Sequence, residues 1–272
     1  MANWLKDKYV VLSGASGGIG RELCKILVQK YNAKVVGIGR SEEKMLSLKA
    51  ELGDDFVYSL FDVSELKNWS NFAQWLNQRG IYPSLLINNA GAFPTFARAM
   101  DAGAETAERI IKNNYLSAVY AIDTLAPLLN REGKHKPAIV NIASSAALCT
   151  VAGTGAYSAS KSALKSYTEA LQLEEKGRYY IGLIAPGTTA TELFREDENT
   201  KNSALDKIAM PAKKMAKKIA RKIIKKRRRA VVGWDAKLMG FTARLLPVKG
   251  LFLIRRVMKA SKSKVFKEVY KK

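Results

Sequence analysis

The chain has 272 residues, which is enough for one large domain or two small ones. Its 47% hydrophobic and 26% charged residues are ordinary for a globular protein and exclude a disordered, collagen-like or coiled-coil chain. The net charge is +22, and a single His with two Cys argues against Ser-His-Asp catalysis, a disulfide framework and a zinc site, so no metal is expected.

Short apolar runs alternate with helical stretches along the first 190 residues. Most of these runs are apolar at every position, which is typical of parallel strands covered by helices on both faces. The predicted strands are residues 9–12, 34–38, 56–61, 84–88, 138–142 and 180–184, with helices between them, for example over 20–31 and 105–130. This alternation predicts an α/β fold with a doubly wound parallel sheet.

A glycine-rich segment follows the first predicted strand and precedes the first predicted helix. It reads Ser13-Gly14-Ala15-Ser16-Gly17-Gly18-Ile19-Gly20. Glycines let the backbone turn tightly and approach a pyrophosphate, while the start of the helix supplies N–H groups and a positive dipole. The order of strand, glycines and helix favours a phosphate-binding turn over a plain glycine-rich turn.

The second predicted strand ends at Gly39-Arg40. An NAD-binding chain usually has an acidic residue here for the ribose 2′-hydroxyl, whereas Arg suits a 2′-phosphate. The pair therefore favours NADP(H), with a solvated loop charge as the alternative reading of Arg40.

Tyr157 and Lys161 are four residues apart, so a helix would place them on one face. An ammonium group beside a phenol favours the phenolate and lowers the phenol pKa from about 10, which makes Tyr usable as an acid or base near neutral pH. Ser144 follows the fifth predicted strand, at the sheet edge where such folds bind ligands. Its hydroxyl is placed to hydrogen-bond a substrate carbonyl.

Five motifs occur in the order found in the short-chain dehydrogenase/reductase family, which the chain resembles over about residues 7–235. They are the turn from Ser13 to Gly20, Asn88-Asn89-Ala90-Gly91, Ser144 thirteen residues before Tyr157, Lys161, and Pro186-Gly187-Thr188-Thr189-Ala190-Thr191. The resemblance implies a Rossmann-like sheet and hydride transfer between NADP(H) and a substrate. Ketone and secondary alcohol would be interconverted.

The resemblance also assigns roles to individual residues. Tyr157 would exchange the proton, Lys161 would lower its pKa and hold the nicotinamide ribose, and Ser144 would polarise the carbonyl. Asn114 would hold a water in the proton relay, with Asn113 as the competing alignment. The expected cofactor contacts are Ser13 (usually Thr in the family), Gly14, Ser16, Gly18, Ile19, Gly20, Arg40, Asp62, which would hydrogen-bond the adenine, Val63, Asn89, Ala90, Gly91, Tyr157, Lys161, Pro186, Gly187 and Thr189.

The positive charge is concentrated in the C-terminal part. Residues 1–199 carry 22 basic and 21 acidic side chains, whereas residues 200–272 carry 24 and 3. Residues 211–226 predict an amphipathic helix. Its apolar stripe either covers the substrate side of the fold, as a helix here does in the family that the chain resembles, and leaves the lysines solvated, or belongs with the basic residues beyond it to a binding surface. Farther on, apolar and basic residues interleave, which is typical of an anchor on an anionic membrane surface. An oligomer contact or a solvated extension is the alternative, and nucleic acid is the least favoured partner because no recognised nucleic-acid motif is present.

We therefore predict a catalytic domain over residues 1–235, a substrate loop at 187–211 and a basic amphipathic extension at 236–272 that the chemistry does not require. The expected substrate is an apolar small molecule such as a steroid, a sphingoid or a long-chain oxo-lipid. A 3-oxoacyl-type or small-carbonyl reductase is the alternative, and a membrane- or nucleic-acid-associated binding protein on the same scaffold is the non-enzyme alternative.

The absence of a signal peptide and of a long apolar run predicts a cytoplasmic protein, peripheral on the membrane. Family relatives suggest a homodimer or homotetramer.

Overall fold

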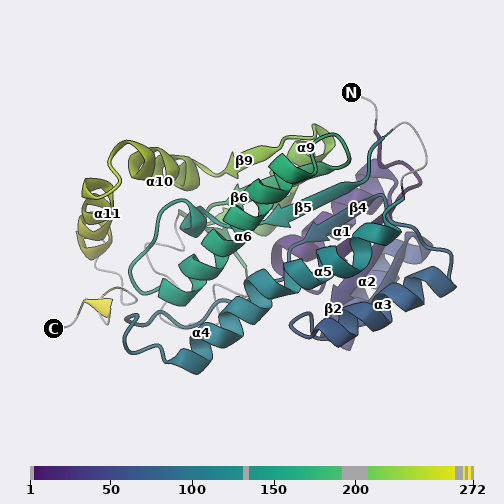
Figure 1. Ribbon diagram of the computed structural model, residues 1–272, viewed down its shortest axis with the longest axis horizontal. Helices are drawn as coiled ribbons and strands as arrows, with labels where there is room; N and C mark the ends of the chain where they lie inside the picture. The colour runs from purple at the N-terminus through teal and green to yellow at the C-terminus, as the bar shows by residue number, and fades with distance from the viewer. Residues whose placement is uncertain (1–2, 131–134, 192–207, 261–265, 267–268, 271–272) are drawn as a thin grey trace.

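The computed structural model describes residues 3–130, 135–191, 208–260, 266, 269 and 270 (Figure 1). Its centre is a parallel seven-stranded sheet in the order β3-β2-β1-β4-β5-β6-β9. The strands are β1 (Tyr9–Ser13), β2 (Lys34–Gly39), β3 (Phe56–Leu60), β4 (Leu85–Asn88), β5 (Ala138–Ile142), β6 (Tyr180–Pro186) and β9 (Arg229–Val232). The six strands predicted from apolar runs are all present, with ends that differ by no more than two residues.

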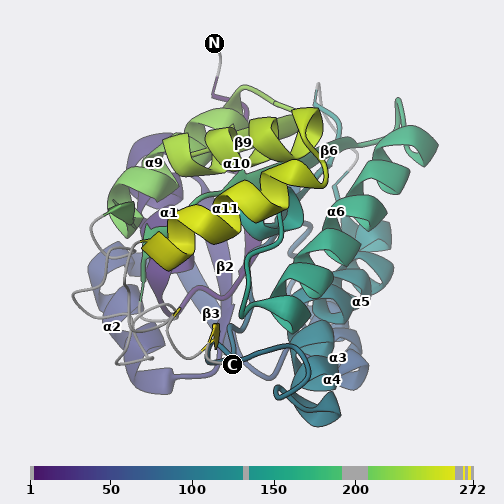
Figure 2. The same ribbon diagram turned by 90° about the vertical axis from the view of Figure 1, so that its left-hand side faces the viewer.

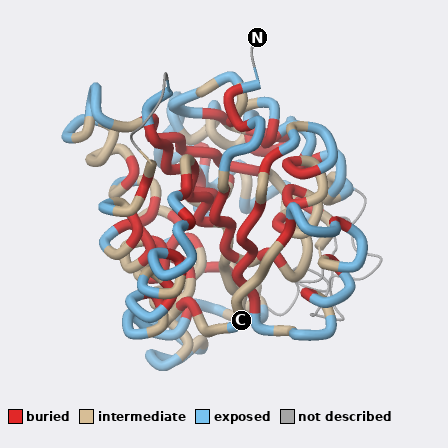
Figure 3. The backbone as a smooth tube through the Cα atoms, turned by 90° about the vertical axis from the view of Figure 1, so that its right-hand side faces the viewer, coloured by how far each residue is buried: buried red, intermediate tan, exposed pale blue. Residues whose placement is uncertain are grey.

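Helices cover both faces of the sheet. One face carries α1 (Gly18–Tyr31), α2 (Glu42–Leu52) and α9 (Ala212–Ile224), and the other carries α3 (Leu66–Gln78), α5 (Ser117–Leu125) and α6 (Gly155–Glu174). Neighbouring strand residues supply both layers, since Val10 packs into the first and Val11 into the second. Figure 3 shows the strands as a buried centre under exposed helices. The predicted doubly wound α/β fold is confirmed.

Helix α9 corrects one expectation. Its apolar stripe is buried, but it packs beside α1 on the sheet and does not cover the substrate side of the fold. The stripe consists of Met215, Ala216, Ile219, Ala220 and Ile223. Most of the basic side chains of α9 are exposed, as predicted. The N-terminal segment also reaches this region, because the indole N–H of Trp4 donates to the carbonyl of Ile224 at 3.2 Å.

The helix predicted over residues 105–130 is interrupted. The chain forms α4 (Ala104–Ile111), a π-helical turn (Lys112–Leu116), α5 and a 3₁₀ turn (Ala126–Leu128). A π turn widens the helix by one residue and often marks a functional site. Here it carries Asn114, which is buried.

After β9 the chain continues into α10 (Trp234–Leu245) and α11 (Lys249–Ala260), which lie together at one end of the molecule (Figures 1 and 2). Short strands β7 (Thr189–Ala190) and β8 (Met210–Pro211) pair at the two ends of the predicted substrate loop, whose residues 192–207 lie outside the described part. Within the described residues, no helix has both the length and the apolar character to cross a membrane.

Candidate active site

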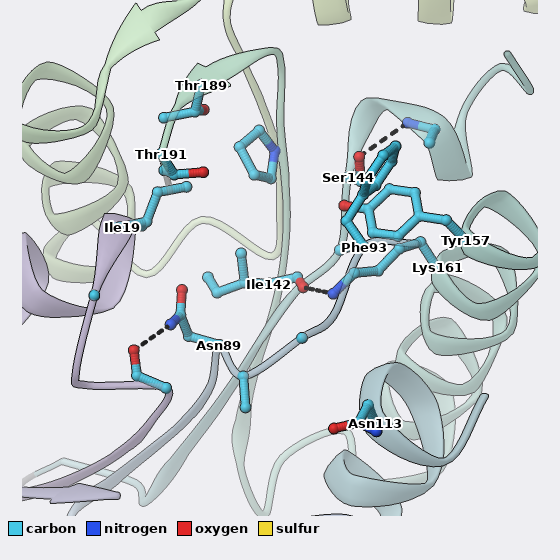
Figure 4. A pocket seen from close by; sticks show the side chains of 18 of the residues that line it. Ile19, Asn89, Phe93, Asn113, Ile142, Ser144, Tyr157, Lys161, Thr189 and Thr191 are labelled. Carbon is cyan, nitrogen blue, oxygen red and sulfur yellow. Dashed lines mark hydrogen bonds between the residues drawn. The ribbon is translucent and has the colours of Figure 1, made fainter. Parts of the chain in front are cut away.

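A cavity of about 510 Å³ lies at the carboxyl ends of the parallel strands (Figure 4). Its volume is typical of small-molecule sites. It lies beside β1, where the strand order turns outward to β2 on one side and to β4 on the other, and doubly wound sheets bind their ligands at this point. The predicted residues on its wall are Gly14, Ser16, Gly18, Ile19, Arg40, Asp62, Val63, Asn89, Ala90, Gly91, Ser144, Tyr157, Lys161, Pro186, Gly187 and Thr189. One cavity therefore brings together most of the site predicted from the sequence.

The glycine-rich turn at the start of α1 is shaped to receive an anion. Gly14 and Gly18 have φ values of +72° and +53°, in the left-handed region that favours glycine. A side chain at Gly20 would collide with the carbonyl oxygen of Gly14. Among the described residues no side chain caps α1, and its first turn carries no acid. The first N–H groups and the positive end of the helix dipole therefore suit the pyrophosphate of a dinucleotide.

Ser13 and Gly20 do not line the cavity, and their contact with the cofactor stays a prediction. The hydroxyl of Ser13 accepts hydrogen bonds from the N–H groups of Asn89 and Ala90, both at 3.1 Å. The side-chain amide of Asn89 in turn donates to the carbonyl of Ser13 at 3.1 Å. Ser13 thus ties the end of β1 to the segment after β4 and shapes the wall from beneath.

The end of the cavity beside β2 is polar and cationic. Ser16, Arg40 and Lys44 line it, together with Ser41, which caps α2 by accepting from the N–H of Lys44 at 3.4 Å. The carboxyl of Asp62 lies at the same end. Burial opposes its ionisation, but hydrogen bonds from the N–H and hydroxyl of Ser64 and the charge of Arg40 hold its pKa below the usual value.

Ser144, Tyr157 and Lys161 meet at the other end (Figure 4). Burial raises the pKa of the Tyr157 phenol, in contrast to the lowered pKa expected from Lys161, and a hydrogen bond with Ser144 opposes that rise. Lys161 is only 4% exposed, and its ammonium group donates to the carbonyl of Ile142 at 3.1 Å. Burial lowers the pKa of Lys161 to about 8, so the ammonium form still dominates at pH 7. The arrangement supplies a protonated phenol beside a buried cation.

Asn114 lies behind this group and does not line the cavity. Its side chain exchanges hydrogen bonds with the backbone of Ala92 and donates to the hydroxyl of Ser160 at 3.0 Å. A side chain at Gly91 would approach both Asn114 and Lys161. Asn113, the competing alignment, is on the cavity wall, and its amide donates to the carbonyl of Arg109 at 3.0 Å.

Several site residues are not predicted from the sequence. Beside Tyr157 the cavity has an apolar wall made of Phe93, Phe96, Val151, Met239, Met258 and Phe266. The rings of Phe93 and Tyr157 are 4.9 Å apart, and the ring of Phe96 lies 5.9 Å from that of Phe266. Met239, Met258 and Phe266 belong to the extension predicted to be dispensable for the chemistry. The extension therefore forms part of the cavity wall, and its being dispensable for the chemistry stays a prediction.

Asp235 at the start of α10 is a further residue that the sequence motifs miss. It is buried, and its carboxylate accepts a hydrogen bond from the N–H of Thr188 at 2.6 Å. The same carboxylate occupies the space where a side chain at Gly187 or Gly233 would lie. Asp235 therefore holds the segment after β6 against the cavity.

Comparison with known proteins assigns the class. Residues 8–202 match the model of the short chain dehydrogenase family, and the chain belongs to that family. An uncharacterized oxidoreductase of Bacillus subtilis is 32% identical over 198 residues, which cover 69% of this chain and 53% of that protein. A short-chain type dehydrogenase/reductase of Sinorhizobium fredii matches over 34% of its length. The chain thus spans about half or less of these two relatives.

Two other relatives have named activities. The 3-ketodihydrosphingosine reductase of Bos taurus is 28% identical, with 72% of this chain and 61% of that protein covered. The (S)-benzoin-forming benzil reductase of Saccharomyces cerevisiae is also 28% identical, with 71% and 76% covered.

Solved structures confirm the fold. A short-chain dehydrogenase from Streptomyces avermitilis has a TM-score of 0.78 at 22% identity and covers 94% of this chain and 100% of its own. A serine dehydrogenase complexed with NADP+ has a TM-score of 0.70 at 25% identity, with 78% of this chain and 88% of its own covered. The chain therefore has the fold of the family that its residues 8–202 match.

Proposed function

We propose that this protein is an NADP(H)-dependent oxidoreductase that interconverts a ketone and a secondary alcohol on an apolar substrate. The observation that carries the proposal is the meeting of Ser144, Tyr157 and buried Lys161 with an apolar wall in one cavity. A carbonyl group bound there has a hydroxyl donor and a proton source on one side and hydrocarbon on the other.

The polar end of the cavity supports NADP(H) over NAD(H). Arg40 and Lys44 are cations, Ser16 and Ser41 are hydroxyl donors, and β2 ends in Gly39 with no acid to meet a ribose 2′-hydroxyl. A 2′-phosphate suits this set, because Arg can bind it through two hydrogen bonds. The uncapped start of α1 would hold the pyrophosphate.

The chain's own residues would manage the proton. The nicotinamide, when bound, supplies or accepts the hydride. Ser144 donates a hydrogen bond to the carbonyl oxygen of the substrate, and Tyr157 gives its phenolic proton to the same oxygen as negative charge develops there. The ammonium group of Lys161 stabilises the phenolate that remains. Burial raises the Tyr157 pKa, so the phenol carries at neutral pH the proton that reduction of a carbonyl consumes.

The apolar wall supports a hydrophobic ketone as the substrate. Phe93, Phe96 and Phe266 offer ring faces, and Met239 and Met258 offer flexible, polarizable side chains that adapt to hydrocarbon. Relatives that reduce a ketosphingoid and the diaromatic ketone benzil agree with this chemistry. A small polar carbonyl would leave most of the wall without a partner.

The test is NADPH oxidation across a panel of a 3-ketosphingoid, a ketosteroid, benzil, a 3-oxoacyl thioester and acetone, with wild type and Tyr157→Phe. We expect turnover of the hydrophobic ketones and a loss of about 10²–10⁴-fold in kcat for Tyr157→Phe. NADPH affinity, measured by fluorescence titration, should change less than threefold.

Tyr82→Phe is the matched control, because the Tyr82 hydroxyl is exposed and bonded to Asn77. Turnover of Tyr157→Phe within tenfold of wild type would contradict the mechanism. NADPH binding without turnover of any ketone would favour the non-enzyme alternative.

A further inference from the structure

Helices α10 and α11 face the cavity with one side. Met239 of α10 and Met258 of α11 line it. Helix α10 packs closely against Leu148, because a side chain at Gly240 would meet that residue. Helix α11 packs closely against α10, because a side chain at Gly250 would meet the backbone of Thr242. Leu148 follows the 3₁₀ turn that begins directly after Ser144. The inner faces of the two helices are therefore fixed against the substrate end of the site.

The outer face of α10 carries an exposed apolar stripe. Trp234, Leu238, Phe241 and Leu245 recur every three or four residues, which places them on one side of the helix. Each is between 57% and 63% exposed, whereas Asp235 and Ala236 on the other side are buried. The exposed apolar surface continues through Leu246, Val248, Leu251, Phe252, Leu253 and Val257. Figure 2 shows both helices on the same side of the molecule.

Cations accompany this surface, and the nearest acid in the described sequence, Asp235, is buried. Residues 236–260 contain six basic side chains and no Asp or Glu. All six are exposed: Lys237, Arg244, Lys249, Arg255, Arg256 and Lys259. On α10, Lys237 and Arg244 lie along one edge of the apolar stripe. Exposed hydrocarbon with a rim of cations is the combination that binds at the surface of an anionic bilayer.

Two other occupants match the surface less well. A second copy of the chain would set six cations against six on contact through this face, which opposes association. Nucleic acid would reward the cations but would leave the apolar stripe in water. An anionic lipid surface satisfies both the charge and the hydrocarbon.

We propose that the α10–α11 hairpin docks on anionic lipid with its outer face while its inner face walls the cavity, so that an apolar substrate passes from the bilayer to Tyr157. The docking part stands on the exposed surface alone. The substrate route rests on the proposed function.

Docking is tested by sedimenting the full-length protein with vesicles of phosphatidylcholine containing 30% phosphatidylserine, and with pure phosphatidylcholine vesicles. We expect binding to the anionic vesicles at least tenfold tighter than to the neutral ones, and weaker binding in 0.5 M NaCl. The variant Phe241→Ser/Leu245→Ser/Arg244→Gln/Lys249→Gln should lose at least tenfold in affinity. None of these side chains lines the cavity, so turnover of benzil in the absence of vesicles should stay within twofold of wild type.

A matched variant separates this surface from the other basic face of the molecule. Lys213→Gln/Lys217→Gln removes exposed cations from α9 and should keep vesicle binding within twofold of wild type. An equal loss of vesicle affinity in both variants would overturn the docking site. Equal affinity of wild type for anionic and neutral vesicles would overturn it as well. A change from dimer to monomer in the hairpin variant, with vesicle binding intact, would also overturn it and identify the face as a protein interface.

The substrate route is tested on the same samples. Anionic vesicles should lower the KM of wild type for a vesicle-borne long-chain ketone by at least fivefold, and this gain should disappear in the hairpin variant. Vesicle binding with equal KM in both proteins would overturn the route and leave docking standing. Vesicle binding by a protein that turns over no ketone would instead refute the proposed function.

Discussion

Asn114 and Ala92 exchange two hydrogen bonds between a side chain and a backbone. The side-chain oxygen of Asn114 accepts from the N–H of Ala92 at 2.6 Å, and its amide donates to the carbonyl of Ala92 at 2.9 Å. The same amide reaches the hydroxyl of Ser160, which donates to the carbonyl of Tyr157 at 2.7 Å. A single buried amide thus connects the segment after β4 with the helix that carries Tyr157 and Lys161.

Replacing Asn114 with Ala should therefore damage both activity and stability. The backbone groups of Ala92 would lose their partners, at a cost of about 1–3 kcal/mol in the free energy of unfolding. We expect kcat to fall roughly 10²-fold as Gly91 and Lys161 shift. Asn113→Ala is the control, since its amide makes an exposed bond to Arg109, and it should keep kcat within threefold. A larger loss for Asn113→Ala than for Asn114→Ala, in steady-state kinetics and urea unfolding, would reverse the assignment.

Lys161→Met should abolish turnover and stabilise the protein at neutral pH. Burial lowers the pKa of Lys161 from 10.5 to about 8, so the folded chain binds fewer protons than the unfolded chain between these values. The stability of wild type therefore rises with pH across that window, and the penalty of the buried charge is complete below it. At pH 7 we expect Lys161→Met to raise the free energy of unfolding by roughly 1–3 kcal/mol, and the gain should shrink toward zero by pH 10.5.

Urea unfolding at pH 7 and pH 10 checks this sign. Lys165→Met is the control on the same helix, because Lys165 pairs with Glu169 at 2.8 Å near the surface. Its effect should stay within about 1 kcal/mol and change little with pH. A gain for Lys161→Met that grew between pH 7 and pH 10 would contradict the burial of its charge.

Arg40→Ala should separate the two nicotinamide cofactors. A charge-assisted hydrogen bond to a phosphate is worth about 1.5–3 kcal/mol, so the Kd for NADPH should rise roughly 10–100-fold. The Kd for NADH should change less than twofold. Arg79→Ala, which removes a cation stacked on Trp75 in α3, is the control in the same fluorescence titration. An unchanged ratio of the two Kd values would remove Arg40 from the cofactor site.

Asp235→Ala should raise the KM for the cofactor. The N–H of Thr188 would lose its acceptor, and the space beside Gly187 and Gly233 would open. We expect a loss of about 1–3 kcal/mol in stability, together with a KM increase and a smaller change in kcat. Asp235→Asn keeps an acceptor of the same shape, so it should retain most of the stability and most of the cofactor affinity of wild type. If Asn proved as damaging as Ala in thermal unfolding and kinetics, the negative charge would be the property that matters.

The sequence predicts the sheet and the polar end of the site well for a physical reason. Parallel strands covered on both faces must be apolar at consecutive positions, so runs such as residues 138–142 stand out. The glycines between β1 and α1 are equally visible, because close backbone approach excludes side chains there. Both patterns lie within a few consecutive residues, so they can be recognised in a single sequence.

The missed features depend on contacts between distant parts of the chain. Met239, Met258 and Phe266 read as apolar residues of an amphipathic extension, and nothing in their spacing tells whether they face Tyr157 or lipid. The π turn around Asn114 is hidden because the apolar pattern on either side suits an uninterrupted helix. The apolar stripe of α9 is evident, but its partner α1 lies some 200 residues earlier.

The bond from Trp4 to Ile224 links positions 220 residues apart. During synthesis at about 5–20 residues per second, roughly 10–40 s separate the appearance of these two groups. Strand β9 is made later still, and it pairs with β6 at the edge of the sheet. The segment that carries Trp4 therefore reaches its native place only after Ile224 has been made, and β6 stays an open sheet edge in the nascent protein until β9 has followed.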